Sequence, residues 1–362
     1  MLVPNWTLMD CTIAAGAPAV VPRWRALAGR GLVPSGHNAP EVMAAAFAQW
    51  PKGKLALVED AEDLRLALPL VRRRLPVPHF QNWSSPINFY GLPHVDRNVA
   101  EAALTVLLRK AAAPLFLKAI PMQGPLWEAV SAAATHLTVV RRWERAVLRP
   151  QGSFERWFET NFDRKRRNTL RRLSSRLSEQ GDLVSATLTE ADDAGAWAGQ
   201  FLALEAAGWK GRRRTALMTD QRTAAAFQAA CAALAASGNL RFWKLELDGM
   251  PLAMMFGYAD GLEVWLGKIA YSEDYAKYSP GVQVLLHATS QLFAEGVVQA
   301  DSCSGPEHPM VDHIWRDRLP VGDVLVAGPA VSRGALLAVM AADRARHSLK
   351  PVARAVLDRF RA

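Results

Sequence analysis

The same order of elements occurs twice along the chain, and this repetition limits the folds that the chain can adopt. In the first half, "PEVMAAAFAQW" (40–50) predicts a short helix, and "KLALVEDAEDLRLALPLVRRR" (54–74) predicts two strands around an acidic turn. In the second half, "RTAAAFQAACAALAASG" (222–238) predicts a helix, and residues 240–271 predict three strands separated by the turn signals DGMP and ADG. Both halves continue with further helices and strands in matching order. We therefore predict an α+β fold with two tandem copies of one unit, each a mixed sheet flanked by helices.

The length of the chain also favours more than one domain. Its 362 residues exceed the roughly 250–300 at which a single hydrophobic core stops growing. We place the first unit at 1–150 and the second at 151–330. A basic helix at 153–180, which Ser153 can cap, links the two. Residues 331–362 read as basic amphipathic helices broken near Pro351.

The cysteine and histidine patterns exclude some classes of protein. The three cysteines are scattered, with no CxxC pair, and the histidines form no cluster at metal-ligand spacing. We therefore expect no disulfide framework, no metal site and a reducing compartment. No apolar run reaches the ~18 residues of a membrane span, and the apolar stretch after Asp10 lacks the preceding basic residues of a signal peptide. A cytoplasmic location is the expectation.

The segment "KYSPGVQVLLH" (277–287) reads as the start of a helix. Ser279 suits the N-cap, and Pro280 suits the first helical position because its missing N–H would have no partner there. Gly281 weakens a first turn by about 1 kcal/mol relative to alanine. The glycine is either incidental, or it lets a ligand approach the free backbone N–H groups.

Four segments of the second half carry a resemblance to a known family. In order they are "RKRRNTLRRLSSRL", "LEAAGWKGRRRTAL" (204–217), the stretch 247–285 and "DSCSGPEHPMVDHIWRDRL" (301–319). Together they resemble the GNAT-superfamily acyltransferases of the CelD/BcsL-like group. That group is distantly similar to the FemAB-type transferases, which also carry two GNAT-like units. The resemblance is strong over roughly 150–325 and weak over 20–150.

The resemblance implies acetyl-CoA or a longer acyl-CoA as the donor. In this family, free amides at the helix start after the fourth strand hold the pyrophosphate of coenzyme A, as helix N-termini do in general. The matching positions here are Ser279, Gly281, Val282 and Gln283. Tyr278-x-x-Gly281-x-Gln283 stands where the family has Gln/Arg-x-x-Gly-x-Gly/Ala, so it departs at both outer positions. The alternative is an ordinary Ser-Pro helix start.

Acyl transfer to an amine needs a base, a polarised thioester carbonyl and a proton for the leaving thiolate. We expect Glu205 or Asp301 as the base, Lys268 as a group that holds an anion or the thioester oxygen, and Tyr278 as the proton donor. The alternatives are structural: a surface carboxylate for Glu205, a turn or helix cap for Asp301, a lysine that reaches solvent and a packed tyrosine.

The acceptor pocket has its own candidates. Trp209 and Lys210 are expected to frame its mouth, although a packed tryptophan is the safer reading of Trp209. His308, Asp312 and Trp315 would share one face of a helix and line the pocket, unless Asp312 simply pairs with an arginine. Cys303 lies beside the cleft without a partner motif for a nucleophile.

Two basic segments account for the net charge of +9. Residues 141–176 hold twelve Arg/Lys against four Asp/Glu, and residues 333–361 hold seven against two. The arginines of the first segment could bind the 3′-phosphate of coenzyme A, a tRNA backbone, an anionic glycan or a lipid headgroup, or form a solvated face. Specific nucleic-acid readout is not expected, because no recognition motif accompanies the charge. The C-terminal helices, with Leu336, Leu337, Val339 and Met340 on the apolar side, would rest on an anionic membrane surface or pack on the catalytic unit.

The sequence thus predicts an acyl-CoA-dependent N-acyltransferase that works by direct transfer in a ternary complex. Its acceptor would be an amine on an envelope-related molecule, such as an amino sugar, a polysaccharide precursor or a long-chain amino lipid. Two alternatives stay open, namely a FemAB-like transferase that uses aminoacyl-tRNA and a non-catalytic scaffold.

Overall fold

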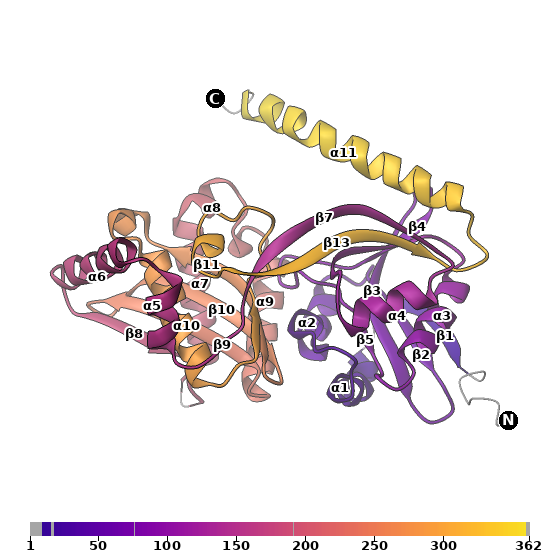
Figure 1. Ribbon diagram of the computed structural model, residues 1–362, viewed down its shortest axis with the longest axis horizontal. Coiled ribbons are helices and arrows are strands. Elements are labelled where there is room, and N and C mark those ends of the chain that lie inside the picture. Colours follow the sequence, from indigo (N-terminus) through magenta and orange to yellow (C-terminus); the bar gives the residue numbers. More distant parts are fainter. Residues whose placement is uncertain (1–8, 16–17, 76, 191, 360–362) are drawn as a thin grey trace.

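The computed structural model describes residues 9–15, 18–75, 77–190 and 192–359. Two lobes lie side by side, and a single sheet of 13 strands runs through both (Figure 1). Among the described residues, no helix combines the length and the apolar character that a membrane crossing requires.

The first unit builds one lobe from seven strands and four helices. The strands are β1 (Asp10–Ala15), β2 (Lys54–Glu59), β3 (Leu64–Arg73), β4 (His79–Asn82), β5 (His94–Val95), β6 (Leu115–Pro121) and β7 (His136–Leu148). The helices are α1 (Val21–Gly29), α2 (Pro40–Gln49), α3 (Ala100–Ala111) and α4 (Pro125–Ala133).

The second unit follows the same plan. Its strands are β8 (Leu183–Thr187), β9 (Leu240–Leu247), β10 (Met250–Asp260), β11 (Glu263–Tyr271), β12 (Gln299–Asp301) and β13 (Asp317–Ala327). Its helices are α5 (Phe154–Asn161), α6 (Arg164–Ser178), α7 (Ala194–Ala207), α8 (Trp209–Arg212), α9 (Gln221–Ala236), α10 (Pro280–Ala294) and the C-terminal α11 (Arg333–Arg359). The DGMP and ADG turns fall between β9, β10 and β11, as predicted.

The pairing pattern confirms the predicted α+β class, with both parallel and antiparallel strand pairs in each unit. In each unit one parallel pair interrupts antiparallel neighbours: β4 with β6 in the first unit, and β11 with β12 in the second. A helix, α3 or α10, connects the two strands of each pair, because a parallel connection needs a crossover. The two units therefore share element order and strand direction.

The units also exchange strands. The sheet order is β1-β2-β3-β4-β6-β13-β7-β12-β11-β10-β9-β8, so the last strand of the second unit lies between β6 and β7 of the first. The far end of β7 pairs with β12, where Ala300 and Asp301 face Leu148 and Val147. In Figure 1, β7 and β13 cross from one lobe to the other. This exchange makes one continuous sheet out of two.

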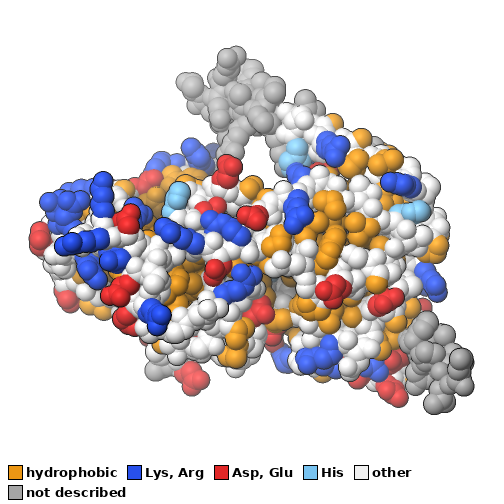
Figure 2. Space-filling view, viewed as in Figure 1, with side chains coloured by type: hydrophobic (Ala, Val, Ile, Leu, Met, Phe, Trp, Pro, Cys, Tyr) orange, Lys and Arg blue, Asp and Glu red, His pale blue; other side chains and the backbone are white. Residues whose placement is uncertain are grey.

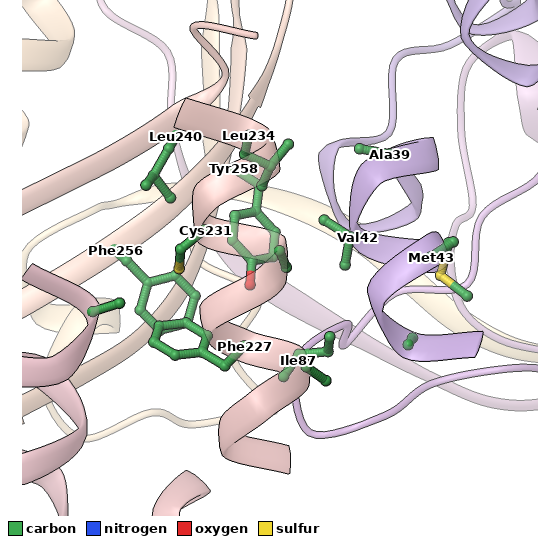
Figure 3. Close-up of a cluster of buried hydrophobic side chains, with 14 of the residues drawn as sticks. Ala39, Val42, Met43, Ile87, Phe227, Cys231, Leu234, Leu240, Phe256 and Tyr258 are labelled. Carbon is green, nitrogen blue, oxygen red and sulfur yellow. The ribbon is translucent and has the colours of Figure 1, made fainter. Parts of the chain in front are cut away.

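A shared hydrophobic core supports the joint between the units. Helix α2 of the first unit packs on α9 of the second. In Figure 3, Val42 and Met43 lie on one side of this contact, and Phe227, Cys231 and Tyr258 lie on the other. All five are nearly inaccessible to water, and burying side chains of this size contributes about 1.5–3 kcal/mol each.

The basic linker differs from its prediction in one respect. A single helix was expected over 153–180, but Phe162 and Asp163 are not helical and separate α5 from α6. Ser153 caps α5 by accepting a hydrogen bond from the Arg156 N–H, and Asp163 caps α6 in the same way through Arg166. An aspartate in extended conformation is a strong N-cap, so it starts a new helix.

The C-terminal segment is one helix and not two. Helix α11 continues through Pro351, where the sequence predicted a break. A proline removes one backbone hydrogen bond, and the alanines, leucines and arginines around it are strong helix formers. Leu336 and Val339 are buried against the sheet of the first unit, so these two side chains are not free to contact a membrane. Asp343 anchors the helix through Lys118 and Arg141, each at 3.3 Å.

Candidate active site

A cavity opens where the parallel strands β11 and β12 separate. The two strands pair only over Glu263–Trp265 and Gln299–Asp301, and beyond that point β11 continues to Tyr271 paired with β10 but not with β12. The cavity at this split has a volume of about 260 Å³. Its lining residues are Phe89, Lys210, Met255, Leu266, Gly267, Lys268, Ile269, Ser302, Cys303, Ser304, His308, Met310 and Val311. The predicted site residues Lys210, Lys268 and His308 thus meet at one cavity.

A bulge in β11 shapes the wall of this cavity. Met255 pairs with Ile269 and Gly257 with Leu266, so two residues of β11, Gly267 and Lys268, oppose the single Phe256 of β10. Bulges of this kind bend a strand and redirect a side chain. The position of Gly267 requires a glycine, because an added Cβ would overlap the Phe256 ring. The bulge explains how a lysine inside an apolar strand reaches the cavity.

Glu205 lies behind two lysines. Its carboxylate is buried within α7, and its Oε1 accepts a hydrogen bond from Lys268 Nζ at 3.0 Å and lies 3.5 Å from Lys210 Nζ. Its Oε2 accepts from the Leu217 N–H at 2.7 Å. Burial lowers the pKa of Lys210, although the negative charge of Glu205 acts in the opposite direction. Glu205 therefore contacts the cavity only through the two ammonium groups.

Asp301 forms an ion pair with Arg145 below the cavity. It is buried, and Arg145 Nη1 lies 3.2–3.3 Å from its two carboxylate oxygens. Burial raises the pKa of Asp301, while Arg145 opposes the rise. Its Oδ1 also accepts the Cys303 N–H at 2.8 Å. Asp301 does not line the cavity but holds the turn that does.

That turn is strained at Cys303. Its φ of 52° lies in the left-handed region, which costs a non-glycine residue about 1–2 kcal/mol. Burial and the nearby Asp301 raise the pKa of the Cys303 thiol well above its usual range. A neutral thiol is a poor nucleophile, so Cys303 serves as part of the wall.

The segment after the turn does not form the predicted helix. His308, Asp312 and Trp315 were expected on one helical face, but only a short 3-10 turn, Val311–His313, is present before β13. Asp312 Oδ2 accepts the His308 N–H at 2.9 Å, and the indole of Trp315 is buried in the core, where it donates to Thr289. Of the three residues, only His308 lines the cavity. Val311 and Trp315 instead pack in the core of the second unit.

The start of α10 is where the sequence predicted it, with a different geometry. Ser279 is the N-cap in a left-handed conformation (φ 54°, ψ 52°), and its side chain makes no capping hydrogen bond. The N–H groups of Val282 and Gln283 donate to Ser279 O, and the Gln283 side chain donates to Tyr278 O at 2.9 Å. Gly281 packs beside Tyr271 and Met310. Tyr278 is buried and does not line the cavity.

Trp209 begins the short helix α8 and is 39% exposed. It therefore lies at the surface and not in the core, with the guanidinium of Arg213 5.3 Å from its ring centroid. Its neighbour Lys210 turns inward and donates to Ile269 O at 2.5 Å.

The matching split in the first unit is closed. There β4 ends at Asn82, whose side chain donates to the carbonyls of Gly91 and Lys118 and accepts the Lys118 N–H at 2.8 Å. These bonds hold β4 and β6 of the first unit together at the position where β11 and β12 of the second unit separate. Within the described residues, no group of three or more His, Cys, Asp or Glu side chains is arranged to hold a metal ion.

Three residues that contribute to the site were not predicted from the sequence. Phe89 belongs to the first unit but lines the cavity, Arg145 pairs with Asp301 across 156 positions, and His37 Nε2 lies 3.2 Å from Leu266 O. Burial lowers the pKa of His37 to about 4. No local pattern marks these residues, because each reaches the site only through the joint between the units.

Part of the second unit matches a known protein family. Residues 164–308 match the family model described as acetyltransferase (GNAT) domain. No curated protein sequence matches the chain.

Three similar solved structures share the fold at low identity. They are the C-terminal domain of a "putative lysylphosphatidylglycerol synthetase" from Agrobacterium fabrum (TM-score 0.57, 13% identity, 90% of this chain and 96% of that chain), L-PGS from Bacillus licheniformis (0.55, 10%, 90% and 97%), and a conserved protein of unknown function from Bacteroides thetaiotaomicron (0.54, 10%, 87% and 99%). The family match covers Glu205, Lys268 and Asp301, and the split strands lie inside it. The chain therefore carries an acyltransferase domain of the GNAT type within a fold of two similar units.

Proposed function

We propose that the protein is an acyl-CoA-dependent N-acyltransferase whose reaction takes place in the cavity between β11 and β12. The observation that carries the proposal is the split of this parallel pair, with polar side chains on both walls and a helix N-terminus, that of α10, following β11. The unpaired edge of β11 beyond Trp265 offers backbone N–H groups to a thioester carbonyl. The start of α10 is the proposed site for the phosphates of the donor, with the Gly281 N–H as the proposed contact, because the N–H groups of Val282 and Gln283 already donate to Ser279 O.

The proposed chemistry is direct transfer in a ternary complex. The amine nitrogen attacks the thioester carbon, the C–N bond forms and the C–S bond breaks. Lys268, which contacts both the carboxylate and the cavity, gives one of its protons to Glu205 Oε1 and takes the proton of the amine, so it ends as the ammonium that it was at the start. Asp301 is less suited to this role, because Arg145 occupies its oxygens.

The leaving thiolate needs stabilisation by a second group. His308 is better placed than Tyr278, because His308 lines the cavity and Tyr278 does not. His308 Nδ1 accepts from the backbone N–H groups of Met310 and Val311 at 3.2–3.3 Å, so its proton resides on Nε2. That N–H is the proposed hydrogen-bond donor that stabilises the departing thiolate, which then takes its proton from water.

The acceptor class is part of the proposal. An amine on an envelope-related molecule is supported by the resemblance to the CelD/BcsL-like group and by the fold shared with proteins named for lysylphosphatidylglycerol synthesis. We also propose a cytoplasmic location, with an anionic membrane surface as the partner of the basic segments.

Transfer from aminoacyl-tRNA is the second candidate, and α6 is the observation that favours it. Six of its cationic side chains are exposed, and Figure 2 shows Lys and Arg gathered over that end of the molecule, at the left. Those exposed residues are Arg164, Lys165, Arg166, Arg171, Arg172 and Arg176. Within the described part of the chain, none of the six forms an ion pair with a carboxylate. Such a surface binds a phosphate backbone with strong salt dependence.

Thermal unfolding with four ligands tests the two candidates. The ligands are coenzyme A, acetyl-CoA, a long-chain acyl-CoA and uncharged tRNA. A ligand that binds only the folded state raises the melting temperature, by an amount that grows with ligand concentration. We expect a rise with a CoA species, its loss in Ser304→Trp, which fills the cavity from its wall, and its retention in Ser131→Trp on the exposed face of α4. A shift with tRNA alone would favour the aminoacyl transfer, and no shift with any ligand would count against both.

A further inference from the structure

The cavity carries an excess of positive charge. Lys210 and Lys268 both reach it, and the single carboxylate between them, Glu205, is fully buried behind them. Glu205 therefore balances only one of the two ammonium groups. None of the residues that line the cavity is an aspartate or a glutamate.

The other ionisable groups nearby lie outside the cavity lining, are paired or are neutral, and the Asp312 carboxylate, which accepts the His308 N–H at 2.9 Å, is one of those that do not line it. Asp301 is neutralised by Arg145 at 3.2 Å. Burial lowers the pKa of His308, which favours its neutral form. The two lysines are thus the charged side chains among the residues that line the cavity, and their partial burial makes electrostatic attraction there stronger than in bulk solvent.

Both lysines have hydrogen-bonding capacity left. An ammonium group has three N–H donors. Lys268 uses two, toward Glu205 Oε1 at 3.0 Å and Thr215 O at 3.2 Å. Lys210 donates to Ile269 O at 2.5 Å and lies 3.5 Å from Glu205. Each lysine therefore has about one N–H available for a ligand, and the fixed partners hold both head groups in place.

The volume limits what can enter. A cavity of about 260 Å³ corresponds to roughly nine water molecules at ~30 Å³ each. Only the reactive end of an acceptor fits, so the amine and any group that the lysines bind must lie within a few bonds of each other.

We propose that the acceptor carries a carboxylate or phosphate group close to its amine, and that Lys210 and Lys268 bind the anionic oxygens of that group. This inference rests on the proposed acyltransferase function and specifies the substrate class of the same site. The shared chemistry is an anionic oxygen next to an amine.

Matched pairs of small amines test the proposal. The pairs are O-phosphoethanolamine with ethanolamine, and β-alanine with propylamine. Isothermal titration of the full chain measures the dissociation constant of each. We expect the member that carries the anionic group, in at least one pair, to bind about tenfold or more tightly than the partner that lacks it, as for a charge-assisted hydrogen bond. The phosphate and carboxylate pairs then separate the two kinds of anion.

Two substitutions at the ion pair have opposite expected effects. Lys268→Gln removes a cation and should abolish the preference for the anion, whereas Lys268→Arg should retain it. Glu205→Gln removes the competing carboxylate and should strengthen anion binding severalfold. Lys52→Gln is the matched control, because Lys52 is exposed in the turn before β2. A purely structural ion pair would show weaker binding in both Lys268→Gln and Glu205→Gln.

Other outcomes would overturn the proposal. Equal binding of both members of every pair, or no binding of any, would exclude an anion subsite. Displacement of the anionic amine by coenzyme A would assign the lysines to the donor and not to the acceptor. Thiol release from acetyl-CoA, measured separately, distinguishes the two hypotheses. Transfer without discrimination between pair members would contradict the anion subsite alone, and anion preference without transfer to any amine would contradict the acyltransferase function alone.

Discussion

Arg145 of β7 and Asp301 of β12 form an ion pair of 3.2 Å between two residues that lie 156 positions apart. Both side chains are buried, and the Arg145 guanidinium also lies 4.0 Å from the ring centroid of Tyr90. The pair joins the two units directly below the candidate active site, and through Asp301 it holds the Cys303 turn.

Loss of one partner of this pair should lower the free energy of unfolding. Arg145→Met leaves Asp301 buried without its cation, which costs about 3–5 kcal/mol for a buried pair. The double variant Arg145→Met/Asp301→Asn removes both charges and should recover a large part of the lost free energy of unfolding. Urea denaturation of the wild type, both single variants and the double variant measures the coupling. Additive losses would show that the pair does not act as a unit.

The stability of the fold should depend on pH through Glu263. Burial and the negative charges of Asp301 and Asp260 raise its pKa from 4.5 to about 7. The folded state thus binds this proton more tightly than the unfolded state, so the stabilisation is complete below about pH 4.5 and is lost as the pH rises to about 7. The full shift corresponds to about 3 kcal/mol, and to roughly half of that for a partly exposed group.

Glu263→Gln should remove this dependence. The variant is expected to be more stable than the wild type at pH 8 by about 1–2 kcal/mol and nearly equal to it at pH 4.5. Chemical denaturation at a series of pH values measures both proteins. An equal difference at pH 4.5 and pH 8 would mean that the effect comes from packing and not from titration.

The glycine at the bulge should resist substitution. Gly267→Ala places a Cβ against the Phe256 ring, and overpacking of a core costs about 1–3 kcal/mol. Gly199→Ala is the matched control, because Gly199 lies in α7 with nothing near an added Cβ and should gain up to about 1 kcal/mol from helix propensity. Thermal unfolding compares the two variants. A neutral Gly267→Ala would mean that the Phe256 ring can move aside.

The sequence predicted local elements better than the site. Turn signals placed β9, β10 and β11, and a lysine inside an apolar strand marked Lys268 as a cavity residue, because a buried ammonium needs a partner. That partner, Glu205, lies 63 positions away, and no local pattern could reveal the contact. The prediction was wrong at His308–Trp315, where a helix would place His308, Asp312 and Trp315 on one face but the chain forms only the short 3-10 turn Val311–His313. Phe89 lines the cavity from the first unit and Arg145 pairs with Asp301 below it, and both contacts join residues that are far apart in the sequence.

Ser279 should be a source of strain at the start of α10. Its left-handed backbone costs a non-glycine residue about 1–2 kcal/mol, and its hydroxyl makes no capping hydrogen bond that would offset this cost. Ser279→Gly relieves the strain but adds freedom to the unfolded chain, worth about 0.4–1 kcal/mol, so we expect a net gain of about 0.5–1 kcal/mol in the free energy of unfolding. Ser279→Ala keeps the strained backbone and should be nearly neutral. Ser153→Ala, at a cap where the side chain does accept a hydrogen bond, should instead cost about 1 kcal/mol. Urea denaturation ranks the three variants, and a loss of stability in Ser279→Gly would show that the serine side chain holds the helix start.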